Sequence, residues 1–202
     1  MNARTILVVV VGLIIGAAAA IAVFPGARQA LIPSSGPITS GKALVGGPFT
    51  LTDDTGKRVT DKDYRGRHML VFFGFTSCPD ICPAGLQLIS AAIENLGPKA
   101  DRLTPIFISV DPERDTPAKL GAYVKNFDPR LVGLTGTPEE IAAVTRAYKV
   151  YFKKVPNAES PGDYGMDHTS IIYVMDPSGE FVAHFTPTTT VEEMTAKLDK
   201  LL

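Results

Sequence analysis

Both cysteines of this 202-residue chain lie in Phe72-Phe73-Gly74-Phe75-Thr76-Ser77-Cys78-Pro79-Asp80-Ile81-Cys82-Pro83. The apolar run Met69–Phe75 predicts a buried strand, and Pro83–Leu96 carries apolar residues at a helical period. Pro83 suits the first helical position, where its missing N–H would have had no partner. We therefore expect Cys82 beside a helix N-terminus, whose partial positive charge favours a thiolate.

The pattern around this stretch alternates apolar strands with helices. Hairpins are predicted at the two ends, inner strands at Leu103–Val110 and Leu131–Leu134, and a long loop over Tyr151–Asp167. The hairpins lie at Phe49–Thr60 and Ile171–Phe185, and the further helices at Pro117–Asn126, Pro138–Tyr148 and Val191–Leu202, with caps at Thr116, Thr137 and Thr190. This order predicts an α/β sandwich with a mixed central sheet and flanking helices.

The N-terminal residues predict a membrane segment. Ile6–Phe24 has no charged side chain and is long enough to cross a bilayer as a helix. A cleavable signal peptide competes with this interpretation, because Ala17–Ala20 offers small residues for cleavage, but the run is longer than a usual signal core. We expect an anchor or signal peptide at 1–24, a flexible Pro/Gly/Ser linker at 25–44 and one domain at 45–202, placed outside the cytoplasm.

The cysteine pair permits three chemistries. Residues at i and i+4 on a helix lie on one face with Cα atoms about 6 Å apart, which suits a disulfide or two sulfurs on one soft metal ion. An inert disulfide, a redox pair and a metal site therefore remain open, although a bridge over so few residues adds little loop-closure entropy. The net charge of −1 gives no bulk attraction to nucleic acid.

A metal would need a third ligand, and the chain offers three histidines. His168 follows the predicted long loop and precedes a strand, where such sheets place ligands. We expect His68, which enters a strand, to be a surface or sheet-end residue, and His184, in an alternating strand, to be structural. Two sulfurs and one imidazole suit Cu(I), or Cu(II) with a weak oxygen ligand, while zinc would want a fourth ligand. Asp80 and Asp167 are nearby oxygen donors that we expect either behind the ligands or at the surface rather than on the metal. Asp167 could orient the His168 ring or raise its basicity.

Three motifs together resemble the signatures of the Sco/SenC family. They are Phe75–Pro83, Ser109-Val110-Asp111-Pro112-Glu113-Arg114-Asp115-Thr116-Pro117 and Tyr164-Gly165-Met166-Asp167-His168-Thr169-Ser170. The resemblance implies a thioredoxin-like, membrane-tethered copper protein that assists cytochrome c oxidase assembly. It covers the domain from about Val45 and the N-terminal segment.

The resemblance implies that Cys78, Cys82 and His168 bind one copper per domain, as Cu(I) or Cu(II). The domain would deliver copper to, or keep reduced the cysteines of, the dinuclear copper site in oxidase subunit II. Further implied partners are another copper chaperone or a thiol reductant, and the implied location is the inner membrane, with one span and the domain in the periplasm.

An alternative to this metallochaperone is an enzyme, a thiol–disulfide oxidoreductase that uses Cys78 and Cys82 without metal.

The motif Asp111–Pro117 is interpreted mainly as a helix cap with charged loop residues, and a role of Arg114 or Asp115 in partner docking stays open.

Overall fold

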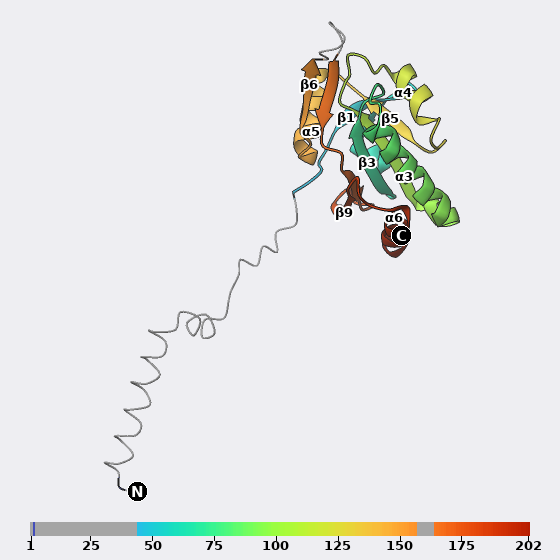
Figure 1. Ribbon diagram of the computed structural model, residues 1–202, viewed down its shortest axis with the longest axis vertical. Coiled ribbons are helices and arrows are strands. Elements are labelled where there is room, and N and C mark those ends of the chain that lie inside the picture. Colours follow the sequence, from blue (N-terminus) through green and yellow to red (C-terminus); the bar gives the residue numbers. More distant parts are fainter. Residues whose placement is uncertain (1, 3–43, 157–163) are drawn as a thin grey trace. The chain divides into compact units, whose positions relative to one another are not determined.

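Strand β3 (His68–Gly74), which leads into the cysteine-bearing loop, is buried along its whole length. In the computed structural model, which describes residue 2 and the ranges 44–156 and 164–202, it is an inner strand of a seven-stranded sheet (Figure 1). It pairs in parallel with β4 (Leu103–Ser109) and antiparallel with β8 (Ile172–Met175). A strand with neighbours on both sides and helices over both faces meets no water, which explains its continuous apolar sequence.

The strand order across this sheet is β2-β1-β5-β4-β3-β8-β9. β4 and β5 pair in parallel, and antiparallel hairpins form both edges. The other strands are β1 (Thr50–Asp53), β2 (Arg58–Thr60), β5 (Val132–Thr135) and β9 (Phe181–Phe185). The predicted mixed sheet with its N-terminal hairpin is therefore confirmed.

Successive aromatic residues of β3 divide the helices between the two faces of the sheet. The Phe72 ring packs with Phe107, which contacts Tyr123 of α4, with ring centroids 5.9 and 5.7 Å apart. Phe73 points to the opposite face, 5.3 Å from the ring of Tyr148 in α5. The helices are α3 (Ile81–Leu96), α4 (Pro117–Val124), α5 (Pro138–Tyr148) and α6 (Val191–Leu201).

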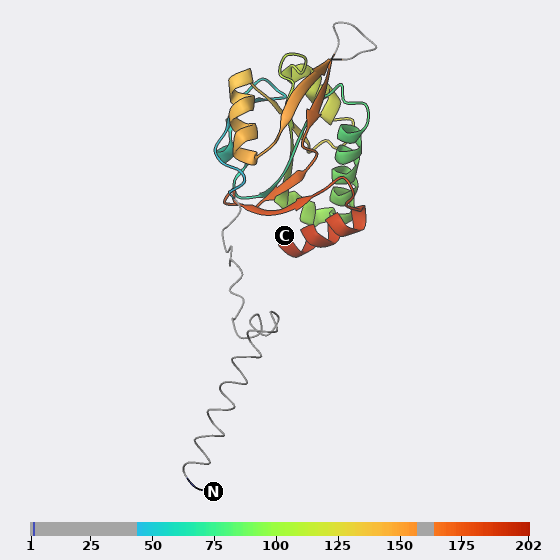
Figure 2. The ribbon, with the colours of Figure 1, turned by 60° about the vertical axis from the view of Figure 1, so that its left-hand side comes forward.

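These contacts make a three-layer sandwich. Helix α3 lies on the Phe72 face with α4, and α6 packs beside α3. Figure 2 shows α5 and α3 on opposite sides of the sheet. This arrangement is the predicted thioredoxin-like fold.

The predicted starts of α4, α5 and α6 are confirmed at atomic detail. The Thr116 hydroxyl accepts a hydrogen bond from the backbone of the first turn of α4. Capping boxes at Thr137 with Glu140 and at Thr190 with Glu193 open α5 and α6. In each box the threonine accepts from the glutamate N–H, and the glutamate carboxylate accepts from the threonine N–H, so two unpaired donors are satisfied together.

The segment predicted as a long loop over Tyr151–Asp167 instead contains strands. β6 (Phe152–Pro156) and β7 (Tyr164–His168) pair antiparallel with each other, separately from the main sheet. The loop prediction is wrong because β6 exposes most of its side chains, so its sequence lacks the apolar pattern that marks a strand in a core. We call β6 and β7 the ligand hairpin.

The predicted anchor Ile6–Phe24 and the linker at 25–44 fall outside the described residues, except for residue 44 at the linker's end. Across the described ranges, no helix has the length and apolarity needed to cross a bilayer. The chain divides into the units Met1–Lys42 and Ala43–Leu202, and every element named above belongs to the second unit.

Two helical glycines give opposite expectations for replacement by alanine. A Cβ at Gly85 in α3 would lie 2.6 Å from the buried Phe72 ring, whereas one at Gly121 in α4 would meet Asp54 atoms at 3.4 Å. We predict that Gly85→Ala lowers the free energy of unfolding by about 1–2 kcal/mol, because overpacking outweighs the gain in helix propensity.

The matched variant Gly121→Ala gains propensity without the clash, so we expect it to be neutral or up to about 1 kcal/mol more stable. Urea denaturation of the soluble domain measures both changes. A stabilised Gly85→Ala protein would contradict the packing described here.

Candidate metal centre

The loop of residues 75–80, here the cysteine loop, connects β3 to α3. It turns sharply, because the Cys78 N–H donates to the Phe75 carbonyl at 3.2 Å. Helix α3 begins one residue before Cys82, so Cys82 lies in its first turn. Pro83 is thus the third helical residue, and the prediction that it is the first is wrong. Proline is tolerated there because N–H groups of the first turn have no intrahelical partner.

The two thiols are free and differ in environment. Cys82 is fully buried, whereas Cys78 is partly exposed. The Cys82 sulfur lies against the end of β3, since a Cβ built on Gly74 would be only 2.6 Å from it. The Cys82 N–H points back to Cys78 Sγ at 3.4 Å. A glycine at position 74 therefore makes room for the inner sulfur, a requirement that the sequence alone did not reveal.

A buried carboxylate holds the start of the cysteine loop. Asp115 accepts hydrogen bonds from the Thr76 N–H at 2.9 Å, the Thr76 hydroxyl at 2.5 Å and the Ser109 hydroxyl at 2.7 Å. The Lys119 ammonium lies 3.3 Å away. The carboxylate thus joins the cysteine loop to the end of β4 and to α4, through hydrogen bonds that are strong because the acceptor is charged.

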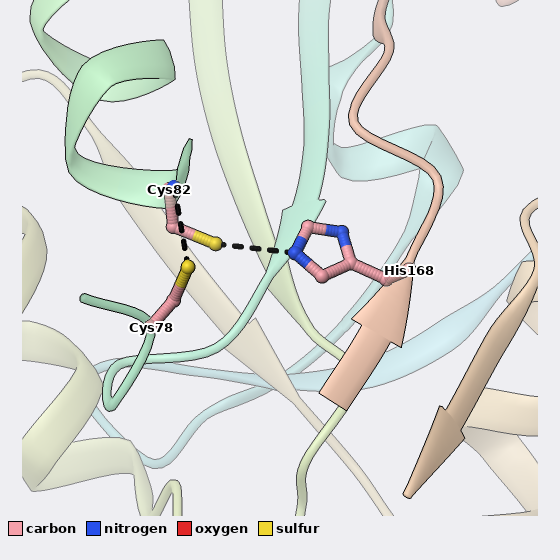
Figure 3. A group of neighbouring side chains, drawn as sticks. All are labelled: Cys78, Cys82 and His168. Carbon is pink, nitrogen blue, oxygen red and sulfur yellow. Dashed lines mark hydrogen bonds between the residues drawn. The ribbon is translucent and has the colours of Figure 1, made fainter. Parts of the chain in front are cut away.

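His168 reaches the sulfurs because it is the last residue of β7. Tyr164, Met166 and His168 share one face of the strand, and Met166 on that face is buried in the domain, while Asp167 on the other face is exposed. His168 Nε2 lies 3.3 Å from Cys82 Sγ (Figure 3). The ring is thus aimed at the buried sulfur from a segment far along the chain.

The other ring nitrogen of His168 fixes the tautomer. Nδ1 lies 3.1 Å from the Thr169 carbonyl oxygen, which can only accept a hydrogen bond. Nδ1 therefore carries the proton, and the Nε2 lone pair faces Cys82. The sequence predicts Asp167 as a residue able to orient this ring, whereas the structure shows the Thr169 carbonyl in that role.

The three donors fit a single metal ion. Cys78 Sγ, Cys82 Sγ and a His168 ring nitrogen all lie within 4.8 Å of one another. Donor atoms bound to one ion at about 2.0–2.3 Å are roughly 4 Å apart in trigonal geometry. A shift of less than about 1 Å in the side chains would therefore bring all three donor atoms to bonding distance from one ion. Among residues 44–156 and 164–202, no other group of three histidine, cysteine or carboxylate side chains is placed to hold a metal ion.

The two thiols differ sharply in acidity. The pKa of Cys78 is lowered to about 4, chiefly because the Cys82 side chain hydrogen-bonds to its thiolate, with help from the backbone N–H groups of Asp80 and Cys82 and against the effect of burial. The pKa of Cys82 is raised above its ordinary value by that same hydrogen bond and by burial. In neutral solution the metal-free pair therefore holds one thiolate and one thiol, and a metal that takes both sulfurs must displace the Cys82 proton.

The remaining candidate donors lie away from the group. His68 is buried at the start of β3, where burial chiefly lowers its pKa, and His184 is exposed and stacked on Phe181 at 6.1 Å. Asp80 and Asp167 are exposed. The predicted set of Cys78, Cys82 and His168 is thus the one that the fold brings together.

The fold and the site define a class, a thioredoxin-like domain with a dithiol and an imidazole at the strand-to-helix junction. The family model described as SCO1/SenC matches residues 38–202. The chain belongs to the SCO1/SenC family.

Two curated relatives illustrate the similarity. The mitochondrial protein SCO1 homolog of Homo sapiens is 51% identical over 147 residues, which cover 72% of this chain and 48% of that protein. The mitochondrial SCO1 homolog 1 of Arabidopsis thaliana is 44% identical, over 83% of this chain and 50% of that protein. The chain therefore spans about half the length of these relatives.

Two solved structures with copper bound each match more than three quarters of this chain. Bradyrhizobium japonicum ScoI with copper bound is 53% identical with a TM-score of 0.72, covering 78% of this chain and 99% of that one. Yeast Sco1 with copper bound is 39% identical with a TM-score of 0.71, covering 77% of this chain and 87% of that one.

We predict that alkylation of Cys78 in the reduced, metal-free protein is independent of pH between 6 and 8. Its lowered pKa keeps it fully a thiolate there, whereas the rate for an ordinary thiol rises nearly tenfold per pH unit in this range. Iodoacetamide labelling with mass spectrometry measures the rate at each cysteine. Cys82 should stay unmodified, because it is buried and protonated.

The variant Cys78→Ser supplies the control, since it should abolish the pH-independent reaction. A Cys78 rate that climbs steeply from pH 6 to 8 would contradict the assigned charge states.

Proposed function

We propose that this protein is a membrane-tethered copper-binding chaperone that serves the dinuclear copper site of cytochrome c oxidase subunit II. The relatives from Bradyrhizobium japonicum and yeast were solved with copper bound, and another solved structure, BsSco, is described as a member of the Sco family of cytochrome c oxidase assembly proteins. The observation that carries the proposal is the convergence of two sulfurs and one imidazole nitrogen within 4.8 Å.

Copper is the cargo of this site, and each donor has a role in holding it. Cys78 offers a thiolate already formed, Cys82 offers a second one after losing its proton, and His168 offers the Nε2 lone pair. Soft sulfur donors favour Cu(I), and an additional weak oxygen ligand would suit Cu(II). One domain then carries one copper.

Release to a partner is proposed to begin at Cys78. This cysteine is the more exposed sulfur and lines a surface hollow with Phe75, Pro79 and Tyr164. An incoming ligand of subunit II, or of another copper chaperone, can approach the ion from that side while Cys82 stays buried. Stepwise replacement of ligands avoids a bare ion in solution.

The tether is part of the proposal. Ile6–Phe24 would form a single span in the inner membrane, residues 25–44 would act as the linker, and the domain from 45 to 202 would work in the periplasm. The length and lack of charge of the first segment support this arrangement.

A second candidate function is thiol–disulfide exchange with subunit II. It is favoured by the free state of both cysteines and by the lowered pKa of Cys78, since a thiolate attacks a disulfide. The dithiol would give two electrons to a partner disulfide, releasing two partner thiols and closing a bond between Cys78 and Cys82. Copper and disulfide use the same sulfurs, so the two functions exclude each other in time.

We predict that the reduced soluble domain binds one copper and that His168→Ala weakens Cu(II) binding at least tenfold. The loss follows because an imidazole nitrogen is removed while both sulfurs remain, and altering even a ligand's support costs about 10–100-fold. Competition with a chelator measures the affinity, and electron paramagnetic resonance reports the nitrogen ligand.

His184→Ala is the matched control, because this exposed histidine lies outside the group and should change neither quantity. Unaltered affinity and spectrum in His168→Ala would rule out the assigned ligand set.

A transfer assay separates the two candidate functions. We expect the Cu(I)-loaded domain to pass copper to the reduced, metal-free copper domain of subunit II, as judged by the optical spectrum of the acceptor after separation. In a parallel reaction the metal-free dithiol is mixed with the oxidised acceptor. Reduction without any copper transfer would favour the exchange function over the chaperone.

A further inference from the structure

The loop between β4 and α4 carries an arginine whose contacts lie on the ligand hairpin. The guanidinium carbon of Arg114 is 3.7 Å from the centroid of the Tyr164 ring and 5.9 Å from that of Phe75. Arg114 Nη1 donates to the Tyr164 carbonyl oxygen at 2.9 Å. The arginine therefore holds both the ring and the backbone of the first residue of β7.

A buried carboxylate completes this contact. Asp111 is 1% exposed and accepts hydrogen bonds from Arg114 Nε and, at 2.8 Å, from the Tyr164 hydroxyl. Each of the three side chains thus contacts the other two. We call Asp111, Arg114 and Tyr164 the hairpin clamp.

The clamp acts on the strand that carries the imidazole. Tyr164 and His168 are the first and last residues of β7, about 13 Å apart at the usual rise, and both lie on its inner face. The hairpin pairs outside the main sheet, and an isolated two-stranded hairpin is marginally stable in water. Its orientation must therefore come from contacts with the rest of the domain.

The hydrogen bonds at the His168 end of the hairpin do not supply such a contact. At the His168 end, the Thr169 N–H donates to the Tyr151 carbonyl at 2.9 Å, and the Tyr151 N–H donates to the Thr169 hydroxyl at 3.0 Å. These bonds connect the two chains of the hairpin to each other. The clamp is a charged, largely buried contact that joins β7 to the loop before α4. It adds to the packing of the buried Met166 of β7 and to the exposed ion pair of Lys154 in β6 with Glu113.

We propose that the hairpin clamp is a positioning device that holds β7 so that His168 Nε2 faces the two sulfurs. This inference rests on the proposed function, because it concerns the third ligand of the copper site. The Phe75 ring links the two regions, since its centroid lies 5.9 Å from the guanidinium carbon of Arg114 and, in an edge-on contact, 5.9 Å from the centroid of the His168 ring. Fixing the strand in advance lowers the entropy lost when the imidazole joins the ion.

The chemistry of the clamp requires arginine. A planar guanidinium can stack on the Tyr164 ring while its nitrogens donate in two directions, to Asp111 and to the Tyr164 carbonyl. A lysine keeps the positive charge, but it lacks the planar group that stacks on the ring and the several N–H donors that point in different directions. Arg114→Lys therefore tests the geometry at constant charge.

The experiment measures Cu(I) affinity of the reduced domain by chelator competition for Arg114→Lys in two backgrounds, the natural sequence and His168→Ala. We expect a roughly 10–100-fold loss in the natural background and less than a twofold change when His168 is already absent. The nitrogen signal in the paramagnetic resonance spectrum of the Cu(II) form should weaken as well. A merely structural role would lower affinity equally in both backgrounds.

Two further variants keep the test decisive. Tyr164→Phe keeps the stacked ring and removes only the hydroxyl bond to Asp111, so a several-fold loss with the same dependence on His168 is expected even if Arg114→Lys folds poorly. Arg130→Lys is the matched control, because Arg130 makes a similar forked contact with Asp128 before β5, and it should leave copper affinity unchanged.

The outcomes are distinguishable from failure of the proposed function. Equal losses in both backgrounds, or no loss in either clamp variant, would overturn the positioning role while the site itself still binds copper. If the natural sequence binds no copper, or binds it as tightly without His168, the proposed function fails, and the inference about the clamp fails with it.

Discussion

The contact between Cys82 Sγ and His168 Nε2, at 3.3 Å, joins residues that are 86 positions apart in the chain. The copper proposal depends on this contact, because two sulfurs of one turn cannot complete a three-donor set by themselves. Different parts of the fold position the sulfurs and the imidazole. The carboxylate of Asp115 and the missing side chain of Gly74 set the sulfurs, whereas β7 sets the imidazole.

The charge states connect the two proposed chemistries. A stable thiolate at Cys78 beside a protonated Cys82 is ready either for a soft metal ion or for attack on a disulfide. In the proposed copper carrier, metal binding would release the Cys82 proton and recruit His168, whereas oxidation would consume the Cys78 thiolate and the Cys82 thiol. The thioredoxin-like junction thus supports two uses of one sulfur pair, and the imidazole biases it toward the metal.

Much of the domain could be predicted from the sequence, because buried strands and capped helices leave local signals. The apolar run at β3 and the threonine–glutamate box at Thr137 are examples. The strands of the ligand hairpin could not be predicted in this way, because β6 exposes most of its side chains and its sequence therefore lacks an apolar pattern. His168 was a candidate ligand because it follows the predicted loop, and the structure places its ring beside Cys82, at the end of β7. The Thr169 carbonyl that fixes its tautomer and the clamp at Arg114 arise from contacts that sequence spacing does not encode.

The most direct test of the account is X-ray absorption at the copper edge on the reduced domain loaded with one equivalent of Cu(I). The account predicts a first shell of two sulfurs at about 2.3 Å and one nitrogen at about 2.0 Å. A shell of sulfurs alone, with no nitrogen, would contradict the convergence of Cys78, Cys82 and His168 on one ion.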